Sequence, residues 1–146
     1  MSRTLAREVA FKALFQLEFN HGEENERELY EDLAVETAIE ETEDEESEKL
    51  NRRNVLYINQ TVRGARARVT DIDETIKKFL KKSWSLSRLG TAERNILRLA
   101  VYELKFAENK NPAGVIINEA VELAKKYGAD DSSRFINGIL DAIASQ

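Results

Sequence analysis

The sequence predicts an all-α protein. One proline and six glycines interrupt the 146 residues, and most other positions hold residues that favour helices, such as alanine, leucine, glutamate, lysine and arginine. Apolar residues recur three or four positions apart rather than in strict alternation. Because 42% of the residues are hydrophobic, the chain can bury a core, and we expect one domain or two small halves sharing that core.

Two helices are predicted ahead of the acidic part of the chain. The first covers residues 4–19, and its apolar stripe consists of Leu5, Val9, Ala13, Leu14 and Leu17. Phe11 and Phe15 lie on an adjacent face, and the Asn-His-Gly sequence that follows is a typical helix end. The second covers residues 26–39 and is predicted to turn inward Leu29, Tyr30, Leu33, Ala34 and Ala38.

Residues 40–48 read EETEDEESE, and their mutual repulsion predicts a mobile, solvated loop or a frayed helix end. A third helix begins near residue 50 and is predicted to bury Val55, Ile58, Val62 and Ala65. A break is expected between Gly64 and Val69, because glycine weakens a helix. The next helix, residues 70–80, has Thr70 or Asp71 as its expected cap.

The rest of the chain is predicted to form a second helical half. Residues 83–91, with the apolar Trp84, Leu86 and Leu89, form a link between halves at 1–82 and 83–146. Helices are then expected over residues 91–108, over 113–127 after Pro112, and from Asp131 or Ser132 to residue 143. The 113–127 helix is predicted to bury Val115 among other apolar residues and to end at a left-handed Gly128.

The net charge of −5 hides an uneven distribution. Residues 23–48 hold 14 acidic residues against one arginine, whereas the remainder holds 21 basic and 13 acidic residues. The remainder is therefore basic, and the total charge does not exclude nucleic acid as a partner.

Few kinds of reaction centre fit this composition. The chain has no cysteine and one histidine, His21, so thiolate chemistry, disulfides and multi-histidine metal sites are excluded. No glycine-rich phosphate loop occurs. Glu119 and Glu122 share a helix face and are a possible acid/base or metal-binding pair, although a surface ion pair is the commoner role of such residues. We expect no catalytic residue, no metal and no cofactor.

The sequence also lacks signals for a membrane or for secretion. No apolar run approaches the roughly 18–20 residues of a membrane span, and charged residues interrupt the N-terminal apolar stretch. We expect a cytoplasmic protein with no membrane contact.

Three groups of residues are candidates for binding nucleic acid. Arg3 and Arg7 lie one helical turn apart, and arginines bind phosphates and stack on bases. Residues 52–82 are rich in cations, but these occupy several helix faces. Lys126 and Tyr127 place a cation beside an aromatic ring, which suits single-stranded nucleic acid. For each group an ordinary solvated surface, or a helix end favoured by its dipole, remains open.

Three stretches resemble one known family. Residues 6–19 read AREVAFKALFQLEF, residues 84–104 read WSLSRLGTAERNILRLAVYEL, and residues 115–141 read VIINEAVELAKKYGADDSSRFINGILD. They are similar to the NusB transcription antitermination factors, with INEA and FINGILD as the most specific elements. The resemblance spans nearly the whole chain apart from residues 23–48.

The resemblance implies two packed helical subdomains and a role without catalysis. NusB proteins bind the boxA element of ribosomal RNA leader transcripts together with NusE, a small-subunit ribosomal protein, and help RNA polymerase read through terminators. By position, the residues implied to face RNA are Arg3, Arg7, Lys126, Tyr127, Asp131 and Phe135. Those implied to lie near NusE are Phe15, Glu93 and Arg98. A core position remains the rival reading of Phe135.

This chain departs from the family in its N-terminus, which carries only Arg3 and Arg7 where relatives often have a denser run of arginines. Fewer cations predict weaker and less salt-sensitive RNA binding by the protein alone. Two alternatives stay open: a structural helical homodimer, and an RNA-binding domain related to that of ribosomal RNA methyltransferases. The role of the acidic segment is also open: it is a passive loop, it binds a basic surface on a partner or on the protein itself, or it repels unrelated RNA.

Overall fold

The computed structural model describes residues 2–146, and every regular element in that part of the chain is helical. The predicted all-α class is therefore confirmed. The chain forms two compact units, one ending at Arg63 and the other beginning at Gly64. This division lies earlier than the predicted link at residues 83–91, because the helix before that link packs on the helix after it.

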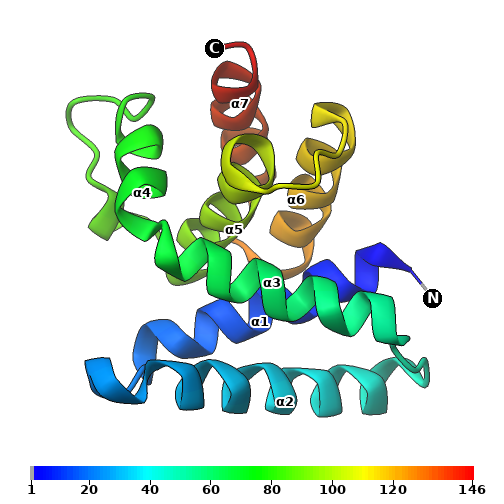
Figure 1. The fold of residues 1–146 in the computed structure, drawn as a ribbon. Helices are drawn as coiled ribbons and strands as arrows, with labels where there is room; N and C mark the ends of the chain where they lie inside the picture. Colours follow the sequence, from blue (N-terminus) through cyan, green and yellow to red (C-terminus); the bar gives the residue numbers. More distant parts are fainter. Residues whose placement is uncertain (1) are drawn as a thin grey trace. The chain divides into compact units, whose positions relative to one another are not determined.

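The first unit contains α1 (Arg3–Phe19), a short 3-10 turn (Glu24–Glu26), α2 (Arg27–Glu46) and most of α3 (Arg52–Ala67). In Figure 1, α2 runs alongside α1. The Ser2 hydroxyl caps α1 by accepting a hydrogen bond from the Leu5 amide at 3.1 Å. The core side chains from α1 and α2 include Val9, Ala13, Leu17, Ala34 and Ala38.

Residues 40–48, predicted to be a solvated loop or a frayed helix end, are helical over most of their length. α2 continues to Glu46 and ends where Ser47 adopts a left-handed backbone, φ 55°. Thr42 is fully buried, and its hydroxyl accepts a hydrogen bond from Lys12 Nζ at 3.0 Å. The same ammonium lies 3.4 Å from Glu45. A cation supplied by α1 thus offsets part of the repulsion that the sequence pattern predicted, and it anchors this end of α2.

Lys12→Met is expected to loosen the last two turns of α2. The substitution removes the charge that faces Thr42 and Glu45 while keeping most of the apolar stem, so about 1 kcal/mol of local stability should be lost. Amide hydrogen exchange over residues 40–46 should then accelerate roughly fivefold.

Lys49→Met is the matched control. Lys49 lies 3.8 Å from Glu43, but its side chain is 84% exposed, so its removal should leave exchange nearly unchanged. Equal protection of residues 40–46 in the wild type and in Lys12→Met would show that Lys12 does not hold this end of α2.

The second unit contains α4 (Val69–Lys77), a 3-10 turn (Leu86–Arg88), α5 (Thr91–Val101), a π-helical turn (Tyr102–Phe106), α6 (Ala113–Tyr127) and α7 (Ser132–Ala144). The predicted bounds of α6 and the break between Gly64 and Val69 are confirmed. The predicted caps of α4 are wrong: Arg68 occupies the cap position without a side-chain hydrogen bond. The helix predicted over 91–108 changes to π-helical geometry at Tyr102.

Three residues predicted to be buried are exposed: Leu29, Leu33 and Val115 are 54%, 48% and 46% exposed. In α2 the predicted burial of Ala34 and Ala38 is confirmed, and the same buried face also carries Val35 and Thr42. Small side chains let two helices approach closely, so α2 turns its alanines toward its partner and its leucines outward.

Gly128 ends α6 in an extended conformation, φ −91° and ψ 178°, so the predicted left-handed conformation is wrong. Glycine is required here for space. A Cβ atom would lie 2.8 Å from the Ala124 carbonyl oxygen, 2.8 Å from Ser132 Cβ and 3.0 Å from Glu93 Oε2. The chain therefore passes closely from α6 to α7 over the start of α5.

Candidate nucleic-acid interface

The first unit brings both predicted N-terminal arginines to one aromatic ring. Arg3 Cζ lies 4.2 Å and Arg7 Cζ 5.8 Å from the centroid of Tyr57, on α3. Arg3 Nε also donates a hydrogen bond to Asn54 Oδ1 at 3.0 Å. Arg3 is half-buried, whereas Arg7 is only 3% exposed. Arg3 is thus the arginine that this surface presents, and Arg7 supports it from within.

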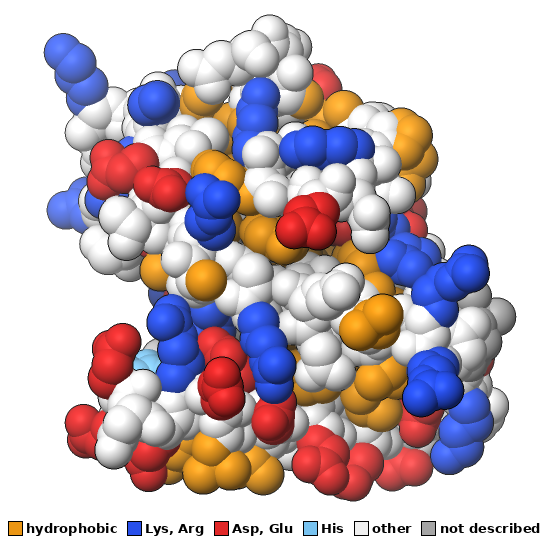
Figure 2. All heavy atoms as spheres, in the orientation of Figure 1, with side chains coloured by type: hydrophobic (Ala, Val, Ile, Leu, Met, Phe, Trp, Pro, Cys, Tyr) orange, Lys and Arg blue, Asp and Glu red, His pale blue; other side chains and the backbone are white. Residues whose placement is uncertain are grey.

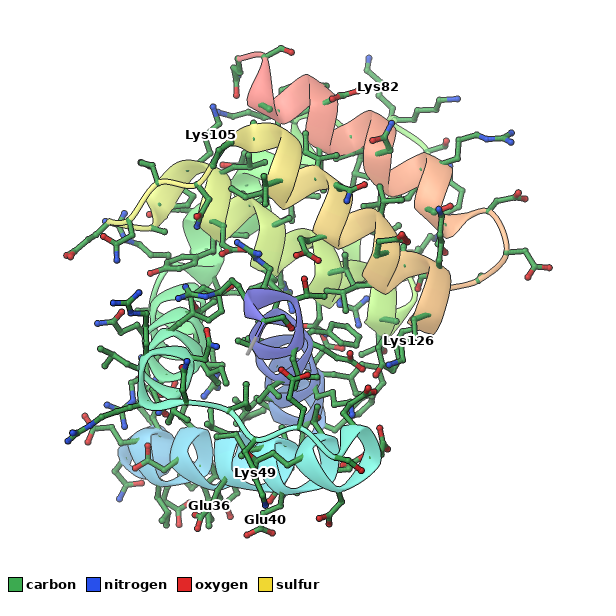
Figure 3. The ribbon with its side chains drawn as sticks, turned by 90° about the vertical axis from the view of Figure 1, so that its right-hand side faces the viewer. Glu36, Glu40, Lys49, Lys82, Lys105 and Lys126 are labelled. Atoms are coloured by element: carbon green, nitrogen blue, oxygen red, sulfur yellow. The ribbon has the colours of Figure 1, made fainter. Side chains whose placement is uncertain are left out.

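The second unit gathers the other predicted RNA residues at the junction of α6 and α7. Lys126 Nζ lies 5.5 Å from the Tyr127 ring centroid, and Figure 3 shows Lys126 in the last turn of α6. Asp131 is exposed and precedes α7. Phe135, in the first turn of α7, is half-buried and faces Trp84, with ring centroids 6.3 Å apart. The junction therefore presents a cation beside partly exposed aromatic rings, which suits phosphates and unstacked bases.

Glu93 holds this junction together from α5. Its Oε2 accepts hydrogen bonds from the Ala129 amide at 2.9 Å and from the Ser132 hydroxyl. Partial burial alone would raise the pKa of Glu93, but the bonds from Ser132 and Ala129 outweigh it and hold that pKa below its usual value. The carboxylate predicted to lie near NusE thus already has partners within its own unit.

Arg98 is similarly engaged. Its Nε and Nη2 donate to the two carboxylate oxygens of Asp73 on α4 at 2.9 and 3.0 Å. The two side chains are 20% and 18% exposed. This two-bond pair fixes α4 against α5, and it leaves only a fraction of the guanidinium surface for a partner.

Phe15 is the predicted partner-binding residue that presents an apolar surface. It is 36% exposed, and its ring lies between those of Phe11 and Phe19, at centroid distances of 6.1 and 5.5 Å. Phe19 is 69% exposed. Sequence reasoning missed Phe19, although its position four residues after Phe15 places it on the same helix face.

The residues considered for enzymatic chemistry have ordinary surroundings. His21 is exposed beside the Gly22 carbonyl, 3.0 Å from its Nδ1. Glu122 pairs with Lys125 at 3.7 Å. Within residues 2–146, no group of three or more histidine, cysteine or acidic residues could hold a metal, and no helix there has the length and apolar character to cross a membrane.

The charges separate as the sequence indicates. Figure 2 shows acidic side chains gathered along the edge formed by α2, beside exposed hydrophobic ones. Glu36 and Glu40 project outward from this helix in Figure 3. The predicted RNA residues belong to α1, α6 and α7, apart from Asp131, which directly precedes α7.

Comparison with known proteins identifies relatives over the whole chain. The transcription antitermination protein NusB of Natranaerobius thermophilus is 40% identical over 146 residues, which covers 100% of this chain and 96% of that protein. NusB of Clostridium botulinum strain Kyoto is 42% identical over 142 residues, covering 96% of this chain and 97% of the relative.

Solved structures agree. NusB of T. maritima superimposes with a TM-score of 0.83 at 38% identity and covers 100% of this chain and 92% of that one. NusB from a crystal structure with NusE and double-stranded RNA gives a TM-score of 0.75 at 32% identity, covering 98% and 96% of the two chains. The NusB family model matches residues 4–145. The resemblance first recognised in three sequence stretches is confirmed over this length, and the chain belongs to the NusB family.

Proposed function

We propose that this protein is an RNA-binding transcription antitermination factor that works with NusE and acts by binding rather than by catalysis. The observation that carries the proposal is the match, over 98% of the chain, to a NusB crystallised with NusE and double-stranded RNA. The RNA class is the boxA element of ribosomal RNA leader transcripts, and the assembly is the antitermination complex of RNA polymerase.

The two groups of predicted RNA residues support this proposal. Arg3 stands over Tyr57 in one unit, and Lys126 stands over Tyr127 in the other. In each pair a cation that can neutralise a phosphate lies on an aromatic ring that can meet a base. Asp131 and Phe135 lie at the start of α7, the helix that follows the second pair in the chain.

The exposed face of Phe15 and Phe19 supports a protein partner. The two neighbouring phenylalanine rings form an apolar patch that is exposed to solvent. Large aromatic side chains are enriched where proteins bind one another. We assign NusE to this face. Glu93 and Arg98 contribute to NusE binding chiefly by keeping α5 in its packed position.

The test is a fluorescence anisotropy titration of labelled boxA RNA with and without NusE. Because α1 carries only two arginines, we expect weak binding by the protein alone and clearly tighter binding once NusE is present. Equal affinity in both conditions would contradict cooperation with NusE. No binding in either condition would contradict the proposed function itself.

Lys126→Gln is expected to weaken RNA binding about threefold to tenfold. The slope of the logarithm of the binding constant against the logarithm of the salt concentration should become shallower by roughly 0.7, the value of one phosphate contact on a single strand. Lys105→Gln is the matched control, because Lys105 belongs to the π-helical turn and lies outside the predicted site. If both variants bind like the wild type, the end of α6 is not part of the RNA surface.

A further inference from the structure

The link between α4 and α5 exposes a large aromatic side chain. Trp84 is the single tryptophan of the chain, and it is 51% exposed. One side of it meets the Phe135 ring, at 6.3 Å between centroids and 35° between planes. Its sequence neighbours Ser83 and Ser85 are exposed as well. Trp84 therefore adds to the partly exposed aromatic surface at the start of α7.

This exposure is built into the fold. The residues after Trp84 are fixed: Leu86 and Leu89 are 7% and 6% exposed, and Arg94 Nη1 donates hydrogen bonds to their carbonyl oxygens at 3.2 and 2.7 Å. The residues before it close a turn, in which the Trp84 amide donates to the Lys81 carbonyl at 2.8 Å. Trp84 is thus held between two anchored segments, and leaving half its surface in water costs hydrophobic free energy that burial would have recovered.

The charge around the link favours RNA over an apolar protein surface. Between Glu74 and Glu93 the chain has five cationic residues and no acidic residue. Lys81 and Lys82 directly precede Ser83 and Trp84, and both are exposed; Figure 3 shows the Lys82 side chain pointing outward. The acidic residues nearest to Phe135 in the sequence are Asp130 and Asp131, which precede α7. The site therefore combines a presented indole with cations, the combination that binds single-stranded nucleic acid.

We propose that Trp84 stacks on an unpaired base of the bound RNA, backed by Phe135, and that Lys81 and Lys82 contact the phosphates next to that base. This inference rests on the proposed function and extends the RNA surface from the α6–α7 junction to the α4–α5 link. It makes Trp84 a contact residue that reads no particular sequence, because every base offers a face for stacking.

The single tryptophan provides the direct measurement. Selective excitation of Trp84 during titration with single-stranded boxA RNA, in the presence of NusE and with NusE alone as the blank, should show saturable quenching. The quenching should follow the same binding curve as the anisotropy of labelled RNA. Binding of RNA by anisotropy without any change at Trp84 would overturn the inference while leaving the proposed function intact.

Two substitutions separate stacking from folding. Trp84→Leu should weaken RNA binding about fivefold to a hundredfold, the range of one base–aromatic stack. Trp84→Phe, which keeps a ring, should retain most of the affinity. Val115→Ala, which truncates an apolar side chain of similar exposure on α6, is the control and should bind like the wild type. Circular dichroism and thermal unfolding verify that all three fold.

NusE is the alternative binding partner for the surface around Trp84, and the same variants distinguish it from RNA. If Trp84→Leu weakens binding of NusE in the absence of RNA and leaves RNA affinity unchanged, the link belongs to a protein interface and the inference is wrong. If Trp84→Leu and Trp84→Phe bind RNA equally well, no base stacks at this position and the inference is again wrong. If even the wild type with NusE binds no RNA, the proposed function fails first.

Discussion

Replacing Glu93 by alanine is expected to lower the free energy of unfolding by about 2 kcal/mol. The carboxylate is the acceptor for the Ala129 amide and the Ser132 hydroxyl, and Ser132 is buried, 7% exposed. Removing the acceptor leaves a buried donor unpaired, which costs about 1–3 kcal/mol for each such group. A Cβ atom added at Gly128 would lie 3.0 Å from Glu93 Oε2. The backbone after α6 therefore packs closely against this carboxylate.

The same contact is expected to make the folded protein less stable as the pH falls into the acidic range. The pKa of Glu93 is lowered in the folded protein, so its contribution is fully present above the unfolded pKa, about 4.3. It is lost as the pH falls through the lower folded pKa, because protonation removes the charge that accepts both bonds. Glu93→Gln keeps an acceptor but cannot titrate, so its stability should fall less steeply below about pH 4.3 than that of the wild type.

Urea unfolding at neutral pH and at several acidic pH values provides this comparison, with Glu122→Gln as the control. Glu122 is exposed and forms a surface pair with Lys125, so its replacement should change neither stability nor pH dependence. A Glu93→Ala protein as stable as the wild type at neutral pH would show that the junction does not depend on this carboxylate.

The helices were largely predictable because their signals are local. The apolar stripe of α1 and the Pro112 and Gly128 boundaries of α6 lie within a few residues of the structure they specify. The last turns of α2 were not predictable in this way. Their stability depends on Lys12, thirty positions from Thr42 in the sequence, and a charge count within residues 40–48 cannot include it.

In the candidate site, too, contacts between sequence neighbours were predictable and contacts between distant residues were not. Lys126 and Tyr127 are neighbours in sequence, and their cation–aromatic pairing could be anticipated. The position of Tyr57 under Arg3, and of Trp84 against Phe135, joins residues about fifty positions apart. Periodicity gives no information about such pairs. The family resemblance identified residues by position, but only the contacts of Glu93 and Arg98 show that both also support the fold.

Arg98→Met is expected to destabilise the protein by about 2 kcal/mol, because it leaves the Asp73 carboxylate without its two-bond partner in a site where both side chains are mostly covered. Asp73→Asn should cost a similar amount. The double variant should cost less than the sum of the two, and chemical denaturation of all four proteins gives the coupling, about 1–2 kcal/mol.

Arg68 and Asp71 supply the internal comparison, since they form an arginine–aspartate pair at 3.7 Å with side chains 54% and 63% exposed. The same cycle there should give a coupling near zero, because solvent screens the charges and the side chains lose entropy on pairing. Asp73→Asn then distinguishes support from contact in NusE binding. If Arg98 acts through the packing of α4 on α5, Asp73→Asn and Arg98→Met should weaken NusE binding equally. If Arg98 itself touches NusE, Arg98→Met alone should weaken it, and releasing the guanidinium through Asp73→Asn should preserve or strengthen the interaction.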